Sequence, residues 1–121
     1  MPARRVAARE LANLFGVLSN PDRIRIVEEL RHGEKDVGTL QALVGISRPR
    51  VSQHLSLMRA HRLVEERRDG RHVYYHLCVG RLATWVLDGL GFVESELKGG
   101  LRETLVEAAR QWREEGSERL T

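Results

Sequence analysis

The sequence predicts a mainly α-helical fold that carries one small β-hairpin. Ser47 is the first sign, because a serine hydroxyl accepts free backbone N–H groups at a helix start, and Pro49 suits the first turn. The second sign is the apolar period, which changes from about 3.6 before residue 61 to 2 after residue 63. The third is Asp69-Gly70, a dipeptide typical of two-residue hairpin turns.

The helix that starts at Ser47 is expected to bury one face and to expose a basic one. Val51, Leu55 and Met58 recur at helical spacing, with Leu57 beside them, and should form the buried face. The other face carries polar side chains, mostly hydrogen-bond donors, which suit base edges and phosphates in a major groove. These are Arg48, Arg50, Ser52, Gln53, Ser56 and Arg59.

The hairpin is expected to run from Val64–Arg68 through Asp69-Gly70 to Arg71–Leu77. Alternation in its second strand puts Val73, Tyr75 and Leu77 on one face and His72, Tyr74 and His76 on the other. Arg67, Arg68 and Arg71 gather near the tip. A basic hairpin beside a basic helix predicts a winged helix-turn-helix. The alternative is an ordinary solvated helix and hairpin, but cap, turn, period and charge all agree.

Length and charge distribution fit this prediction. The 121 residues suggest one domain with a helical appendage, and 41% hydrophobic content is enough for a core. Residues 1–77 contain 14 Lys and Arg against 9 Asp and Glu, whereas residues 78–121 contain 6 against 8. The positive charge therefore lies in the half that holds the basic helix and hairpin, which favours a nucleic-acid partner.

Composition also excludes some classes of protein. No apolar run is long enough for a transmembrane helix, and the N-terminus lacks a signal core, so a cytoplasmic location is expected. The single cysteine, Cys78, cannot form an intrachain disulfide. The sequence holds no phosphate-binding glycine loop, HExxH or Ser/His/Asp arrangement, so we expect no enzyme.

The N-terminal third should form three helices. Arg4–Leu18 has an apolar face broad enough to indicate contact beyond the monomer's own core. Asn20 is expected to cap a second helix that starts at Pro21 and ends near Gly33. Residues 34–38 should form a polar loop anchored by the side chain at 37, and residue 39 is expected to cap a short third helix that reaches residue 44. Gly45 suits the turn that follows, so residues 39–61 form the predicted helix-turn-helix.

The C-terminal third should form two more helices. Arg81–Leu97 carries a long apolar stripe, Gly99-Gly100 is a break, and Leu101–Trp112 is amphipathic. Glu115–Thr121 is expected to be a polar, frayed tail. The predicted domains are residues 1–97, the winged helix-turn-helix with dimerisation helices, and residues 98–121, the added helix and tail.

Three segments resemble the ArsR/SmtB family of bacterial winged-helix repressors. They are LSNPDRIRIVEEL (Leu18–Leu30), VGISRPRVSQHLSLMRAHRLV (Val44–Val64) and RRDGRHVYYHL (Arg67–Leu77), in the family's order and spacing. The resemblance covers roughly residues 8–97. It implies a homodimer, paired through the first and the long C-terminal helices, that binds an inverted-repeat DNA operator and represses transcription.

The expected site residues follow from these patterns and from the resemblance. The expected DNA contacts are Thr39, Ser47, Arg48, Pro49, Arg50, Ser52, Gln53, Ser56, Arg59, Arg67, Arg68, Arg71 and His72. The expected dimer contacts are Leu11, Leu14, Phe15, Trp85, Leu90 and Val93.

The metal sites familiar in the family are not expected here, and no cofactor is expected. Asp36 and Gly38 stand where the thiolate ligands would be, and no histidine follows His76. His72 and His76 lie about 13 Å apart at strand rise, too far to share one ion. Cys78 is expected to be a plain buried cysteine rather than a redox sensor.

Some alternatives stay open at this stage. A winged-helix module that binds protein rather than DNA would use the same fold. A repressor that responds to a metal or an oxidant through a non-standard site is also compatible with the sequence. The effector, the operator and the regulated genes do not follow from the residues.

Overall fold

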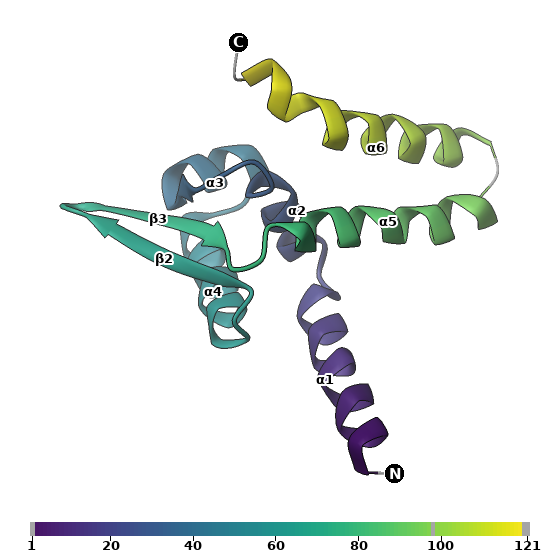
Figure 1. Ribbon diagram of the computed structural model, residues 1–121. Coiled ribbons are helices and arrows are strands. Elements are labelled where there is room, and N and C mark those ends of the chain that lie inside the picture. Colours follow the sequence, from purple (N-terminus) through teal and green to yellow (C-terminus); the bar gives the residue numbers. More distant parts are fainter. Residues whose placement is uncertain (1, 98, 120–121) are drawn as a thin grey trace. The chain divides into compact units, whose positions relative to one another are not determined.

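A computed structural model describes residues 2–97 and 99–119, with all their side chains except those of residues 95 and 114–119. It is mainly helical and contains the predicted β-hairpin, in agreement with a winged helix-turn-helix (Figure 1). A third, short strand that was not predicted joins this hairpin. The elements are α1 (Pro2–Leu18), α2 (Pro21–Glu29), β1 (Lys35–Asp36), α3 (Val37–Val44), α4 (Arg48–Ala60), β2 (Val64–Asp69), β3 (His72–Leu77), α5 (Arg81–Glu96) and α6 (Gly100–Arg119).

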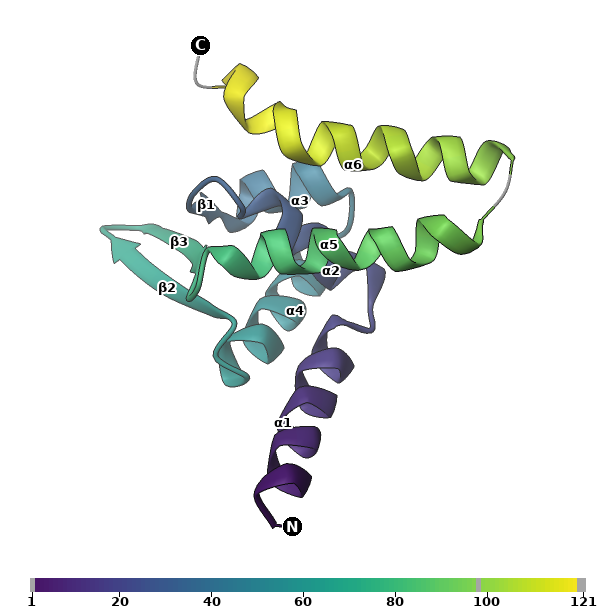
Figure 2. The same cartoon turned by 45° about the vertical axis from the view of Figure 1, so that its right-hand side comes forward.

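The chain divides into two compact units, Met1–Val79 and Gly80–Thr121. The first unit holds α1 to β3, and both views show α1 extending away from its other helices (Figures 1 and 2). The second unit is a helical hairpin in which α5 and α6 run side by side. The expected domain boundary after residue 97 stays a prediction. None of the helices in the described residues is both long and apolar enough to cross a membrane.

The core of the first unit forms where α2, α3 and α4 pack together and meet the base of the sheet. Its most deeply buried side chains are Ile26, Val27, Leu40, Val51, Leu55, Met58 and Val64. Val51, Leu55 and Met58 confirm the buried face expected for α4, but Leu57 is 38% exposed and does not belong to it. Residue 57 lies two positions from residue 55, about 200° around a helix, and so turns toward solvent.

Two predicted helix starts are confirmed. The Asn20 side chain accepts the backbone N–H groups of Asp22 and Arg23, with Pro21 as the first residue of α2. The Ser47 hydroxyl accepts the N–H of Arg50 at the start of α4. Between α3 and α4, Gly45 has φ 77° and donates its N–H to the carbonyl of Gln41, which gives the expected tight turn.

The start of α3 differs from the prediction. Asp36, rather than Thr39, is the N-cap, and its Oδ1 accepts the backbone N–H of Thr39 at 2.7 Å. The predicted polar loop also hides a short strand, because Lys35 and Asp36 pair antiparallel with Tyr75 and Tyr74 of β3 (Figure 2). A pairing between residues so far apart in sequence leaves no local pattern that could have predicted it.

The hairpin forms with a turn one residue later than expected. Asp69 pairs with His72 as the last residue of β2, so Gly70 and Arg71 form the two-residue turn. Gly70 has φ 61°, and a positive φ at the first central position of a hairpin turn is where glycine is favoured. The sheet order is β1-β3-β2.

The last helix is longer than the prediction. Helical backbone continues to Arg119, so residues 115–119 do not form the expected polar tail, and residues 120 and 121 lie outside the described residues. Glu115, Glu118 and Arg119 are strong helix formers and favour this continuation, whereas Gly116 disfavours it.

An arginine in the left-handed backbone conformation ends helix α4. Arg62 has φ 61°, its N–H donates to the carbonyl of Arg59, and the N–H of Leu63 donates to that of Met58. These two bonds form a Schellman cap, whose left-handed position is usually glycine because a Cβ is unfavourable there.

We expect Arg62→Gly to raise the free energy of unfolding by about 0.5–1 kcal/mol, because relief of the left-handed strain exceeds the extra chain entropy of glycine. Denaturant unfolding at a fixed protein concentration measures the change. Arg62→Ala is the matched control, since it removes the guanidinium but keeps the Cβ, and should stay near the wild type. Equal stabilisation by both substitutions would contradict the strain explanation.

Candidate nucleic-acid interface

The helix α4 presents one polar face to solvent because its other face is fully packed. The residues predicted to face DNA on this helix are all exposed: Arg48, Pro49, Arg50, Ser52, Gln53, Ser56 and Arg59. The N-terminal turn is free of apolar cover, and its first peptide N–H groups carry the positive end of the helix dipole. This end of α4 can therefore approach an anionic, hydrogen-bonding surface.

A polar cluster from α2 supports the same helix from behind. His54 is only 12% exposed in its side chain, its Nδ1 lies 3.3 Å from Nη1 of Arg23, and its Nε2 lies 3.8 Å from Oδ2 of Asp22. Burial and the Arg23 charge lower the pKa of His54, so its ring is neutral near pH 7. His54 is thus a packing residue rather than a cation offered to a ligand. Arg50 reaches the same carboxylate, at 3.6 Å, and keeps 62% of its side chain exposed.

The hairpin of β2 and β3, here called the wing, has two different faces. On the face toward α4, Glu66 lies 3.3 Å from Nη1 of Arg59 and 3.6 Å from Nε of Arg68. The Tyr75 hydroxyl donates to the same carboxylate at 3.4 Å, and burial raises the pKa of this tyrosine, so it stays protonated. Glu66 therefore ties the wing to the end of α4.

The opposite face of the wing carries Arg67. Its guanidinium donates through Nε and Nη2 to the two oxygens of Glu34, at 3.0 and 2.6 Å. The same group lies 4.8 Å above the ring of Tyr74, the residue opposite it on β3. The ion pair lowers the pKa of the Glu34 carboxyl, which is therefore ionised at neutral pH.

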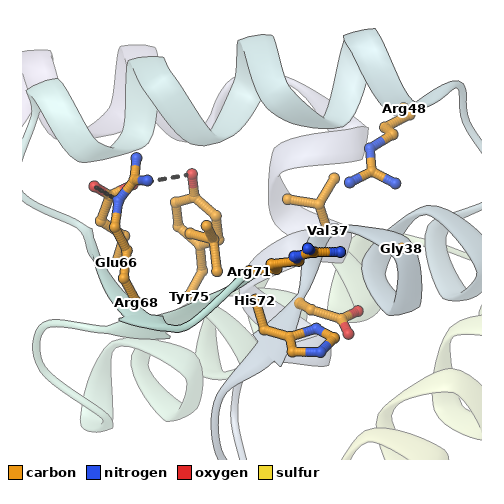
Figure 3. A pocket seen from close by; sticks show the side chains of 10 residues that line it. Val37, Gly38, Arg48, Glu66, Arg68, Arg71, His72 and Tyr75 are labelled. Carbon is orange, nitrogen blue, oxygen red and sulfur yellow. Dashed lines mark hydrogen bonds and ion pairs between the residues drawn. The ribbon is translucent and has the colours of Figure 1, made fainter.

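A hollow of about 320 Å³ lies between the wing and the starts of α3 and α4 (Figure 3). Arg48 and Arg71 line it, together with His72, Val37, the Glu66–Arg68 pair and the Asp36 carboxylate, whose pKa the Thr39 hydrogen bonds and, to a smaller extent, the charges of His72 and Arg48 lower. Figure 3 shows Arg48 and Arg71 toward one end, and Glu66, Arg68 and Tyr75 toward the other. Within the described part of the chain, no carboxylate lies at ion-pair distance from Arg48 or Arg71.

The remaining expected contacts are also at the surface. Thr39 is exposed inside α3, and its backbone N–H and hydroxyl both bond to Asp36, which lowers the pKa of that carboxyl. Ser47, His72, Arg67 and Arg68 are exposed as well. The structure therefore groups the predicted residues around α4 and the wing but separates Arg67 from Arg68 across the two faces of the sheet. Their contact with DNA stays a prediction.

Carboxylates that position the basic side chains were missed in the sequence. Asp22, Glu34 and Glu66 each hold one or more of the predicted arginines. One signal was available, because strand alternation puts Glu66 and Arg68 on one face and Arg67 on the other. The partners of these side chains come from distant elements, so no local pattern names them.

No group of three or more His, Cys, Asp and Glu side chains in the described residues is arranged to hold a metal ion. Cys78, expected to be a buried cysteine, is half-buried. Burial and the nearby Glu65 carboxylate raise the pKa of its thiol, which disfavours the reactive thiolate.

Large apolar side chains are exposed on α1 and α5. Leu11 is 49% exposed, Phe15 53%, Trp85 44% and Val93 51%, while Leu14 and Leu90 are half-buried. These are the residues expected at a dimer interface. Exposed apolar surface of this kind, on each of the two helices taken by itself, is typical of surface that another chain covers.

The family model for "Bacterial regulatory protein, arsR family" matches residues 20–66, from the cap of α2 into β2. Among curated proteins, the "Biofilm growth-associated repressor" of Xylella fastidiosa is 39% identical over 79 residues, which are 65% of this chain and 69% of that protein.

Solved structures agree with this match. The transcriptional repressor BigR from Xylella fastidiosa has a TM-score of 0.66 and 35% identity, covering 76% of this chain and 93% of that one. NolR from Sinorhizobium fredii has a TM-score of 0.68 and 33% identity, covering 77% and 92%. With its winged helix-turn-helix, this chain belongs to the arsR family of bacterial regulatory proteins.

Proposed function

We propose that the protein is a sequence-specific DNA-binding regulator that represses transcription by occupying an inverted-repeat operator as a homodimer. One observation carries the proposal: the exposed, basic start of α4 lies beside a wing whose Arg71, like Arg48, has no carboxylate at ion-pair distance in the described residues. The names of the relatives, a biofilm growth-associated repressor and BigR, support repression. A target on the chromosome implies that the protein works in the cytoplasm, and the proposal assigns it no catalytic activity.

In the proposed complex, α4 enters a major groove and reads base edges with its N-terminal turns. Arg48 and Arg50 can recognise guanine through two hydrogen bonds, and Gln53 can recognise adenine in the same way. A phosphate near the hollow would meet Arg48 from the helix and Arg71 from the wing. Neither cation would have to break an ion pair with a carboxylate of the described residues before it binds, although the Asp36 carboxylate lines the same hollow.

The homodimer is supported by the apolar faces of α1 and α5. A two-fold axis would place the two copies of α4 about 34 Å apart, one helical turn of DNA, and would require an inverted repeat. Part of the affinity for the operator would then depend on association of the two chains.

We expect Gln53→Ala and Arg71→Ala to weaken DNA binding in different ways. Gln53→Ala should cost about 1–3 kcal/mol on the operator and relax preference at one base pair in each half-site. Arg71→Ala should weaken binding to all sequences alike and reduce the salt slope of log K by about 0.9.

The measurement starts with selection of genomic fragments by the wild-type protein, followed by fluorescence anisotropy on a selected duplex and on a scrambled one. Equal losses on both duplexes for Gln53→Ala would contradict its role in reading bases. A wild-type protein that selects no DNA would instead favour the protein-binding module.

We expect Val93→Arg to weaken both self-association and operator binding by at least tenfold, because it places a charge within the proposed dimer interface. Val79→Arg is the matched control, since Val79 is the same residue with nearly equal exposure, 53% against 51%, outside α1 and α5. Sedimentation equilibrium and anisotropy report the two properties. A wild-type monomer at micromolar concentration that binds the inverted repeat tightly would rule out the dimer.

We expect operator binding to persist in chelator-treated buffer and not to be released by zinc, nickel or cobalt. These ions favour clustered Cys and His ligands, and the chain has one Cys and five His, with none on α1, α5 or α6. Calorimetry together with anisotropy decides the point. A stoichiometric site of submicromolar affinity that changes operator affinity tenfold or more would overturn this expectation.

A further inference from the structure

We infer that Arg67 is a positioning residue, held by Glu34, that fixes the wing against the start of α3 instead of binding a DNA phosphate itself. The inference rests on the proposed DNA-binding function and replaces the direct DNA contact that the sequence predicted for Arg67. It concerns an ion pair that joins two segments 33 residues apart.

The first support is the face on which Arg67 lies. Pairing of β2 with β3 sets Arg67 opposite Tyr74, and Glu66 opposite Tyr75. Glu66 contacts Arg59 of α4 and lines the hollow, so its face is the one toward the recognition helix. Because neighbouring residues of a strand point to opposite faces, Arg67 lies on the side away from α4.

The second support is that the donors of Arg67 are already in use. Nε and Nη2 bond to both oxygens of Glu34, Nη1 lies 3.9 Å from the Asp69 carboxylate, and the guanidinium plane lies over Tyr74. A two-pronged pair of this kind fixes direction as well as distance, unlike a single contact. A phosphate would have to break this arrangement before it could bind Arg67.

The third support is what the pair connects. Glu34 directly precedes β1, whose Asp36 pairs with Tyr74 and also caps α3. The Arg67–Glu34 pair thus spans from β2 across β3 to the chain that enters the helix-turn-helix. The pair adds to the two-residue pairing of β1 with β3 and to the contacts of α3 with β3, which also join the wing at this end. Arg71 lies on the wing, and Arg48 lies at the start of α4 in the helix-turn-helix. Loss of the pair should therefore change the position of these two arginines relative to each other.

The pair is solvent-exposed, with side-chain exposures of 48% for Arg67 and 37% for Glu34. Exposed ion pairs contribute little to overall stability, so we expect the effect in the placement of the wing and not in the folded fraction. The signature of a positioning role is therefore a loss of operator affinity with an unchanged number of phosphate contacts.

The test uses Arg67→Ala, Glu34→Ala and the double variant that carries both substitutions, and Arg71→Ala serves as the reference. Anisotropy measures the affinity of each variant for the selected operator over a range of salt concentrations. We expect each single substitution at the pair to weaken binding about two- to fivefold, and the double variant to be no weaker than either. The salt slope of log K should stay at the wild-type value for all three, whereas Arg71→Ala lowers it by about 0.9. The charge swap Glu34→Arg with Arg67→Glu should recover part of the affinity.

Unfolding curves and sedimentation on the same samples verify that each variant is folded and associates as the wild type does. A reduced salt slope for Arg67→Ala, with Glu34→Ala neutral or tighter, would overturn the inference and make Arg67 a phosphate contact. Additive losses in the double variant would overturn it as well. Failure of the proposed function looks different, because the wild-type protein would then show no preference for any selected duplex.

Discussion

The proposed DNA-binding surface depends on the packing of one side of α4 against α2 and α3. A helix of 13 residues is barely stable alone in water, so its position must come from tertiary contacts. Val51, Leu55 and Met58 are each 0% exposed, and burial of such side chains contributes about 1.5–3 kcal/mol apiece. Because these three residues fix the rotation of the helix, they decide which residues face outward, including Gln53 and Arg48.

Carboxylates add a second level of order to the basic surface. Asp22 orients Arg50, Glu66 orients Arg59 and Arg68, and Glu34 orients Arg67. Each pair reduces the rotamer freedom of a long side chain before any partner arrives. On such a surface, some arginines are held by carboxylates and a few others are not. This arrangement favours binding of DNA in one defined orientation over indiscriminate attraction to anions.

The sequence predicted most of what is locally determined. Asn20, Ser47 and Gly45 act through neighbours within four residues, so their roles could be read directly. The class of fold, and the exposed residues of α4, follow from periodicity and charge in the same way.

The features that the sequence did not predict depend on residues far apart in the chain, or on a choice between residues that suit the same position almost equally well. Strand β1 exists only because β3 lies beside it. The cap is Asp36 rather than Thr39, and these two residues, three positions apart, both suit a helix start. In α5, Leu87 is 6% exposed, whereas Trp85, an expected dimer contact, is 44% exposed. A continuous apolar stripe does not say which part of it the chain itself covers.

The order β1-β3-β2 has a consequence for the protein in a crowded cell. Strand β2 forms an outer edge of the sheet, and an open edge of six residues is a template on which another chain could add a strand. Its sequence after Val64 is Glu-Glu-Arg-Arg-Asp, so charges line both faces of that edge. A second copy of the same strand that ran parallel and in register would bring like charges together, whereas an antiparallel copy could set Glu65 opposite Arg68. The charged side chains of the wing therefore also disfavour parallel, in-register addition of identical strands at this edge.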